Sequence, residues 1–225
     1  MNILGIDTAT RVCSVAVTRD GAVLGEVNID AGTTHSQKLL LAMEQALRQA
    51  GLGKEEIDLA GVSMGPGSFT GLRIGLATAE AFAYARKQPL HGVDTLMALA
   101  CNCREEGRLL SPIIDAQKGN YYQALYRWQA GELCCLAPTE IVNVEKLLER
   151  IQGRECLLLG ECGKLKDLPG NIEVAEDEIR MPLARSICYL SQRDYNREQD
   201  QRIFGLEPYY IRRSEAEELW ERLHP

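Results

Sequence analysis

Apolar and polar positions alternate through the opening of the chain in short runs separated by turns. Asn2 to Ile6 is an apolar run that ends at Asp7, and Val12 to Thr18 spaces its valines as a half-buried strand does. Asp20-Gly21 is a hairpin signal, so residues 22–29 should return as a third antiparallel strand. The chain is therefore predicted to open with a three-stranded meander.

The apolar spacing then changes to that of a helix. A helix that begins at Thr34 or Ser36 and reaches about Gly51 would have one broad apolar band, formed by Leu39, Leu40, Met43, Ala46, Leu47 and Ala50. Further strands are predicted at 57–64 and 90–93, followed by a short helix at 95–103.

A long helix is predicted between those two strands, after the turn Gly65-Pro66-Gly67. Gly67 is expected to take the positive φ of a type II turn, and Ser68 to cap the helix. Within the helix a stripe of small residues recurs every four positions: Gly71, Gly75, Ala79 and Ala83. Because a helical glycine costs about 1 kcal/mol relative to alanine, the stripe indicates that another element approaches this backbone closely.

Two interpretations of the turn remain open. In one, the N–H groups at the start of the helix bind a phosphate group. In the other, the turn is a tight connection from a strand into a core helix. The segment GPGSFTG lacks the Gly-Lys-Ser/Thr ending of a P-loop, so it offers neither the lysine for phosphate nor the hydroxyl for magnesium.

The second half of the chain repeats the plan of the first. Residues 113–116 match 5–8 in kind, 121–128 alternates as 12–18 does, and a helix at 144–151, a strand at 155–159 and a helix at 182–193 follow. We therefore expect an α/β fold of two duplicated βββαβα lobes, residues 1–106 and 107–225. A last helix is expected after Ser214, where a capping box begins.

Composition restricts the function classes. The chain has 225 residues, 45% of them hydrophobic, which is enough to bury a full core. Its net charge of -7 argues against unaided binding of nucleic acid. Eight cysteines without a CxxC pair and three scattered histidines predict reduced, mostly buried thiols and no metal site. No apolar run approaches the ~20 residues of a membrane span, so a soluble intracellular protein is expected.

Two such lobes resemble those of the actin-like ATPase superfamily, in which paired aspartate-containing turns face a nucleotide between the lobes. The sequences of five segments resemble the TsaB (YeaZ) family, and the resemblance covers essentially the whole chain. The segments are ILGIDTAT at the N-terminus, GPGSFTGLRIG at 65–75, GVDTL at 92–96, IIDAQKGNYYQALY at 113–126 and EPYYIR at 207–212.

The resemblance implies a cytoplasmic partner subunit in making N6-threonylcarbamoyladenosine (t6A) at position 37 of tRNAs. Such a subunit is not catalytic alone, but dimerises with and activates the TsaD transferase, its paralogue. TsaE, an ATPase, and TsaC, which supplies threonylcarbamoyl-adenylate, complete the pathway. tRNA would be reached only through the complex, and no membrane is involved.

The resemblance implies no cofactor for this chain itself. TsaD carries a metal-binding histidine pair at HxxxH spacing, whereas here Leu39 stands four residues after His35, so that no metal site is expected. Any binding of ATP or ADP is expected to be weak and to occur within the complex.

The partner interface is expected on the two helices of the first lobe. The small-residue stripe would admit a second helix beside an apolar ridge, so that two helices from each partner form a four-helix bundle. The predicted interface residues are Leu40, Met43, Leu47, Gly71, Leu72, Gly75, Leu76, Ala79 and Ala83. The alternative is that this chain's own sheet covers both helices. Without TsaD, the same surface should form a two-fold homodimer.

A vestigial nucleotide site is predicted at Asp7, Thr8 and Asp115. In a working actin-like site these residues would position magnesium and phosphate; alternatively, they cap turns through hydrogen bonds to the backbone. The turn at 160–164 lacks a Gly-Gly pair and is interpreted as an ordinary turn. Arg73 is unfavourable for the helix dipole, so we expect it to contact an anion or a partner carboxylate.

Two enzyme classes are alternatives to the partner subunit. An actin-like ATPase or small-molecule kinase would act alone through Asp7 and Asp115, and steady ATP turnover by the purified chain would reveal it. A peptidase has no support, because three scattered histidines cannot complete a Ser/His/Asp or HExxH arrangement.

Overall fold

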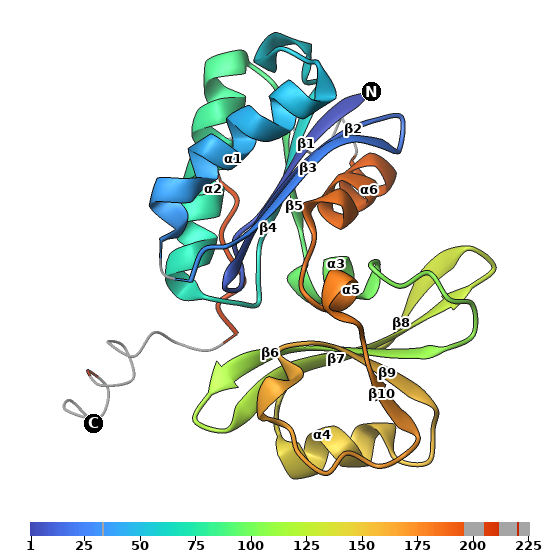
Figure 1. The fold of residues 1–225 in the computed structure, drawn as a ribbon. Helices are drawn as coiled ribbons and strands as arrows, with labels where there is room; N and C mark the ends of the chain where they lie inside the picture. Colours follow the sequence, from blue (N-terminus) through green and yellow to red (C-terminus); the bar gives the residue numbers. More distant parts are fainter. Residues whose placement is uncertain (33, 196–204, 212–219, 221–225) are drawn as a thin grey trace.

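The computed structural model describes residues 1–32, 34–195, 205–211 and 220. The helix predicted after Ser214 lies outside the described residues. Two five-stranded sheets form two lobes, with helices on the outside of each lobe and between them (Figure 1).

The first sheet has the strand order β3-β2-β1-β4-β5. Its strands are β1 (Asn2–Asp7), β2 (Val12–Arg19), β3 (Ala22–Asp30), β4 (Leu59–Ser63) and β5 (Leu90–Val93). β1, β2 and β3 form the predicted antiparallel meander, and β4 and β5 add to β1 in parallel. β1 and β4 are continuous apolar runs because both faces of the sheet are covered at its centre.

The second sheet repeats this order as β8-β7-β6-β9-β10. Its strands are β6 (Leu109–Gln117), β7 (Asn120–Gln129), β8 (Glu132–Asn143), β9 (Cys156–Gly160) and β10 (Ile172–Val174). The predicted duplication is therefore confirmed for every strand of the first lobe. β10 has only three residues and was not predicted, because so short a run has no measurable period.

Helices α1 (His35–Ala50) and α2 (Phe69–Arg86) lie together on one face of the first sheet (Figure 1). On the second sheet only α4 (Val144–Ile151) has a corresponding place. Between β9 and β10 the chain forms just the 3₁₀ helix Cys162–Lys164, so within the described residues α2 has no counterpart. A second 3₁₀ helix, Lys54–Glu56, precedes β4.

Two helices pack on the sheet of the opposite lobe. α6 (Ala184–Asp194), from the second half, covers β1, β2 and β4, where Ala184 and Cys188 are buried with residues of β1 and β4. α3 (Thr95–Ala100), from the first half, packs on β6, β7 and β9. Both helices and the short α5 (Asp177–Arg180) lie between the two sheets (Figure 1). The boundary expected at 106/107 thus separates the strands of the two sheets but not their helices.

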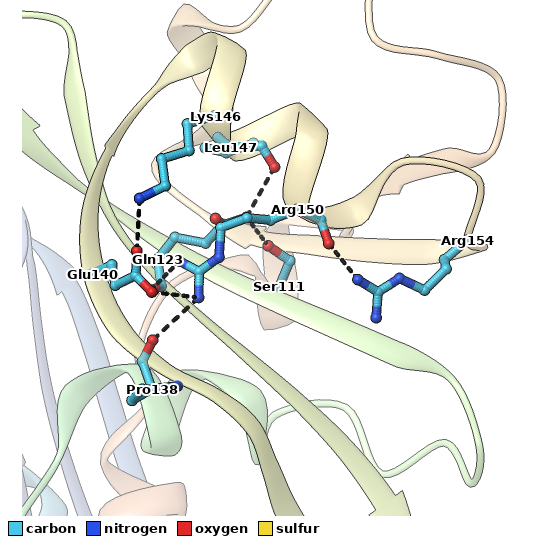
Figure 2. A network of polar contacts seen from close by, with 8 residues as sticks. All are labelled: Ser111, Gln123, Pro138, Glu140, Lys146, Leu147, Arg150 and Arg154. Atoms are coloured by element: carbon cyan, nitrogen blue, oxygen red, sulfur yellow. Dashed lines mark hydrogen bonds and ion pairs between the residues drawn. The ribbon is translucent and has the colours of Figure 1, made fainter.

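A buried polar side chain joins α4 to the second sheet. Gln123 of β7 is fully buried, and its Nε2 donates to Ser111 Oγ (2.9 Å) on β6 and to Leu147 O (3.3 Å) on α4 (Figure 2). Because this amide group on β7 bonds to both β6 and α4, it helps to set the position of α4 over the sheet.

Arg150 extends this connection to the edge strand β8. Its guanidinium donates to Gln123 O (3.4 Å) and Pro138 O (3.3 Å) and lies 3.7 Å from the Glu140 carboxylate, which also accepts from Lys146 Nζ (2.9 Å) (Figure 2). These polar contacts add to the apolar cluster between α4 and the sheet, which includes Leu147 and Ile151, whereas the other face of the sheet packs on α3.

Candidate functional site

The turn before α2 differs from the predicted type II geometry. The positive φ belongs to Gly65 (107°) and not to Gly67, and the Gly65–Pro66 peptide is cis. Gly67 is required for another reason, since a Cβ there would lie 2.4 Å from Ala9 O. Ser68 caps α2 as predicted, because its Oγ accepts from Gly71 N (3.2 Å).

The small-residue stripe of α2 faces the interior of its own chain. A Cβ at Gly71 would lie 2.1 Å from Thr8 O, and one at Gly75 would lie 2.3 Å from Thr8 Oγ1. Ala79 and Ala83 are fully buried. The close approach that the stripe predicted is therefore real, but the element that approaches is the end of β1.

This orientation corrects most of the predicted partner interface. Seven of the nine residues are buried within the chain and offer little or no surface to a partner: Met43, Gly71, Leu72, Gly75, Leu76, Ala79 and Ala83. Leu47 is half-buried, and Leu40 is exposed (64%). The prediction was wrong for the buried seven because periodicity does not reveal which of two apolar helix faces meets the sheet.

The outer surface of the two helices nevertheless carries exposed apolar side chains. We call it the α1/α2 face and define it by Leu40, Leu41, Ala77, Ala81 and Tyr84. Leu41 (65%) and Tyr84 (63%) are as exposed as Leu40. Leu41 was not predicted, since it falls outside the apolar band that meets the sheet.

A cavity of about 530 Å³ opens between the two lobes. Both first-lobe helices begin at it, α1 with His35 and α2 with Phe69 and Thr70. Arg11, Asp115 and Glu161 contribute charges, and Tyr122, Tyr209 and Tyr210 contribute rings. The cavity lies where the predicted superfamily places its ligand, at the carboxyl ends of β1, β6 and β9.

The predicted vestigial nucleotide residues are not brought together in this cavity. Asp7 is fully buried, its Oδ1 accepts from Ala9 N (3.1 Å), and burial raises its pKa to about 6. Thr8 Oγ1 donates to Gly71 O (2.7 Å). Only Asp115 lines the cavity, where its Oδ1 accepts from Gln117 N (2.7 Å) and its Oδ2 pairs with Lys164. Asp7 and Asp115 make the local contacts of the turn-capping alternative, whereas Thr8 bonds to the backbone of α2; Asp115 also faces the cavity.

Glu161 and Arg11 are cavity residues that the sequence analysis did not single out. Gly160, the last residue of β9, has a φ of 100°, and a Cβ there would lie 1.9 Å from Ile113 O. This close approach places Glu161 beside β6, where its Oε2 accepts from Asp115 N (2.8 Å). A charged residue directly after a buried strand was the available signal for Glu161.

Arg73 contacts aromatic rings and not the anion that was expected. Its guanidinium lies 3.9 Å from the centre of the Phe69 ring, and its Nε donates to Tyr210 Oη (3.0 Å). The neighbouring Tyr209 N donates to Met64 O (2.6 Å). The segment 205–211 is thereby fixed across the start of α2, and Arg73 contributes a cation–π contact to it.

Other chemistry is limited in the part of the chain that the structure describes. No group of three His, Cys, Asp or Glu residues there could hold a metal ion. All eight cysteines are free thiols, and five of them are buried, as predicted. Within the same residues no helix is both long and apolar enough to cross a membrane.

Comparison with known proteins identifies relatives of nearly equal length. The chain is 30% identical over 239 residues to the tRNA threonylcarbamoyladenosine biosynthesis protein TsaB of Escherichia coli (strain K12), covering 99% of this chain and 98% of that protein. It is 29% identical over 233 residues to the protein of the same name from Bacillus subtilis (strain 168), covering 98% of each. The family model of TsaD, tRNA N6-adenosine threonylcarbamoyltransferase, matches residues 25–220.

Solved structures show the same fold. YeaZ from Pseudomonas aeruginosa superposes with a TM-score of 0.79 and 25% identity, covering 93% of this chain and 99% of that chain. The ethanolamine utilization protein EutJ from Carboxydothermus hydrogenoformans, at a TM-score of 0.51 and 14% identity over 83% of this chain and 89% of that chain, shares the fold alone. The predicted two-lobed actin-like fold is confirmed by these neighbours. Together, the matched family model, the two relatives of almost equal length and the common fold show that this chain belongs to the TsaB (YeaZ) branch of the TsaD family.

Proposed function

We propose that this chain is a subunit of the machinery that makes threonylcarbamoyladenosine on tRNA, and that it binds and activates a TsaD-like transferase. The names of its TsaB relatives support a part in t6A biosynthesis. The observation that carries the partner role is the α1/α2 face, where Leu40 and Leu41 of α1 and Tyr84 of α2 are exposed on two helices that cover the same face of the sheet.

The α1/α2 face suits association with another pair of helices. Ala77 and Ala81 on α2 leave room for a close approach, and the two leucines of α1 supply apolar surface beside it. Two helices from a partner would complete a four-helix bundle. The predicted homodimer of the isolated chain would use the same surface, because a two-fold axis brings identical faces together.

The cavity supports a role other than catalysis. A nucleotide-hydrolysing actin-like site needs acidic groups that reach the ligand, but Asp7 is enclosed and Thr8 Oγ1 bonds to α2. Asp115 does face the cavity but pairs with Lys164. Weak binding of ATP or ADP within the complex stays a prediction.

The remaining partners follow from the same proposal. A TsaE-like ATPase and TsaC act with the TsaD-like protein in the cytoplasm, and tRNA is bound through the complex and not by this acidic chain alone. Its net charge of -7 disfavours direct contact with phosphates.

The test is light scattering coupled to size-exclusion chromatography, on this chain alone and mixed with the TsaD-like protein of the same cell. The wild type should form a homodimer that exchanges into a 1:1 heterodimer. Leu41→Glu should weaken both by at least about tenfold, because burying one leucine contributes roughly 1.5–3 kcal/mol.

The matched control is Leu136→Glu, at a leucine of β8 that is also exposed (41%) but lies on the other lobe. It should associate as the wild type does. A wild-type chain that ignores the TsaD-like protein would contradict the partner role, and steady ATP turnover would then favour the ATPase or kinase alternative.

A further inference from the structure

The two walls of the cavity between the lobes carry opposite charges. The first lobe contributes Arg11 and the starts of α1 and α2, and the second lobe contributes the carboxylates of Asp115 and Glu161. The proposed partner role, which uses the α1/α2 face, does not explain this separation of charge.

The first-lobe wall is suited to an anionic group. Phe69 and Thr70 begin α2, and the N–H groups of a first helical turn have no carbonyl of their own helix to bond. His35 begins α1 at the same cavity; it is only 4% exposed, and its Nδ1 has no partner among the described residues. Arg11 also lines this wall, where its guanidinium carries a formal positive charge and forms an ion pair with Asp30 that includes a 3.1 Å hydrogen bond from Nε to Oδ1.

The second-lobe wall is suited to a cationic group. Lys164 already pairs with Asp115, whereas within the described residues no lysine or arginine pairs with Glu161. Glu161 is anchored by the hydrogen bond from Asp115 N (2.8 Å). Burial raises the pKa of Glu161, whereas the hydrogen bond from Asp115 N and the nearby charges of Lys164 and Arg11 act to lower it.

Aromatic rings line the cavity together with these charged groups. Phe69, Tyr122 and Tyr210 line the cavity, and its volume of about 530 Å³ is ample for a small ligand with an apolar group. A ligand with only an anionic group would face Glu161 unpaired, and one with only a cationic group would leave the N–H groups at the start of α2 without an acceptor. A ligand that carries both groups satisfies both walls.

We propose that this cavity binds a free amino acid with an apolar or aromatic side chain, as its zwitterion. The carboxylate lies at the start of α2 and beside Arg11, the ammonium group lies at Glu161, and the side chain lies among the rings. Binding is non-covalent, and no bond of the ligand is broken.

The test is isothermal titration calorimetry of the full chain with L-phenylalanine and two analogues. 3-Phenylpropionate lacks the ammonium group, and 2-phenylethylamine lacks the carboxylate. L-Phenylalanine should bind, and each analogue should bind about tenfold more weakly or worse, as expected for the loss of one charge-assisted contact.

Glu161→Gln separates a zwitterion site from a general anion site. The glutamine keeps an acceptor for Asp115 N but removes the negative charge, so L-phenylalanine should bind this variant no better than 3-phenylpropionate does. Glu178→Gln, at an exposed position of α5 outside the cavity, should bind L-phenylalanine as the wild type does.

Three outcomes would overturn the proposal. They are no heat of binding up to the solubility limit of L-phenylalanine, equal affinity for L-phenylalanine and 3-phenylpropionate in the wild type, and unchanged affinity in Glu161→Gln. None of them bears on the α1/α2 face, whose association is measured without any amino acid present.

Discussion

At the scale of single residues, two glycines fix the place of α2 on the first sheet. Thr8 Oγ1 donates to Gly71 O (2.7 Å), and a Cβ at Gly75 would lie 2.3 Å from the same hydroxyl oxygen. The end of β1 therefore lies directly against the helix backbone, and the contact leaves no room for a methyl group.

We expect Gly75→Ala to destabilise the fold by about 1–3 kcal/mol, because overpacking outweighs the roughly 1 kcal/mol by which alanine favours a helix. Urea denaturation followed by circular dichroism measures the change. Gly163→Ala is the control, since a Cβ there meets nothing within 4 Å, and it should be nearly neutral. A Gly75→Ala variant as stable as the wild type would contradict this account of the stripe.

Asp7 gives the fold a dependence on pH. Burial raises its pKa from 3.8 to about 6, so between these values the folded chain keeps a proton that the unfolded chain releases. Its contribution to stability is therefore full below pH 3.8 and is lost as the pH rises through about 6.

Asp7→Asn removes this titration, so the variant should be more stable than the wild type by about 2–3 kcal/mol near neutral pH and equally stable near about pH 4. Urea denaturation across this range measures the difference. Asp167→Asn, at an exposed aspartate, is the control and should differ little from the wild type in stability. A constant difference between Asp7→Asn and wild type at every pH would argue against the titration of Asp7.

At the scale of elements, periodicity predicted which segments form strands and helices better than what covers them. The meander, α1, α2 and the repeated strands follow from local apolar spacing and turn residues. The direction in which the small-residue stripe faces does not follow from this spacing, because a helix with two uncharged faces can pack on a sheet through either face. The position of α6 could not be predicted either, because its own sequence does not indicate that it packs on the sheet of the other half.

The candidate site could be predicted only where an apolar strand ends in an aspartate. Asp115 was found because it repeats the place of Asp7 after an apolar run. His35 begins α1, whereas Arg11 and Glu161 lie in loops; the three are far apart in the sequence, and only the pairing of β6 with β9 and the packing of the lobes bring them to one cavity. Asp7 and Asp115 hold matching places in the two halves, but Asp7 is fully buried whereas Asp115 lines the cavity.

At the scale of the whole molecule, the exchanged helices make the two lobes depend on each other. Ile3, Ala16 and Leu59 of the first sheet are covered by Ala184 and Cys188 of α6. A fragment ending at residue 106 would expose this apolar surface to water, and such a loss is large compared with the stability of a small domain.

We therefore expect residues 1–106 alone to lack a cooperative unfolding transition in urea, whereas residues 1–195 should unfold in one. Circular dichroism and NMR spectra of the backbone amides of both fragments measure this difference. A fragment 1–106 that unfolds as cooperatively as the longer one would show that α6 is dispensable for the first lobe.

The shared starting point of α1 and α2 has a mechanical consequence. Each helix is a stiff rod, of 16 and 18 residues respectively, with one end at the cavity and its flank on the α1/α2 face. A partner that slides either rod along its axis by one residue moves the cavity wall by about 1.5 Å, which is half the length of a hydrogen bond. We therefore expect that such a displacement, if a partner causes it, would also change the affinity of the cavity for its ligand.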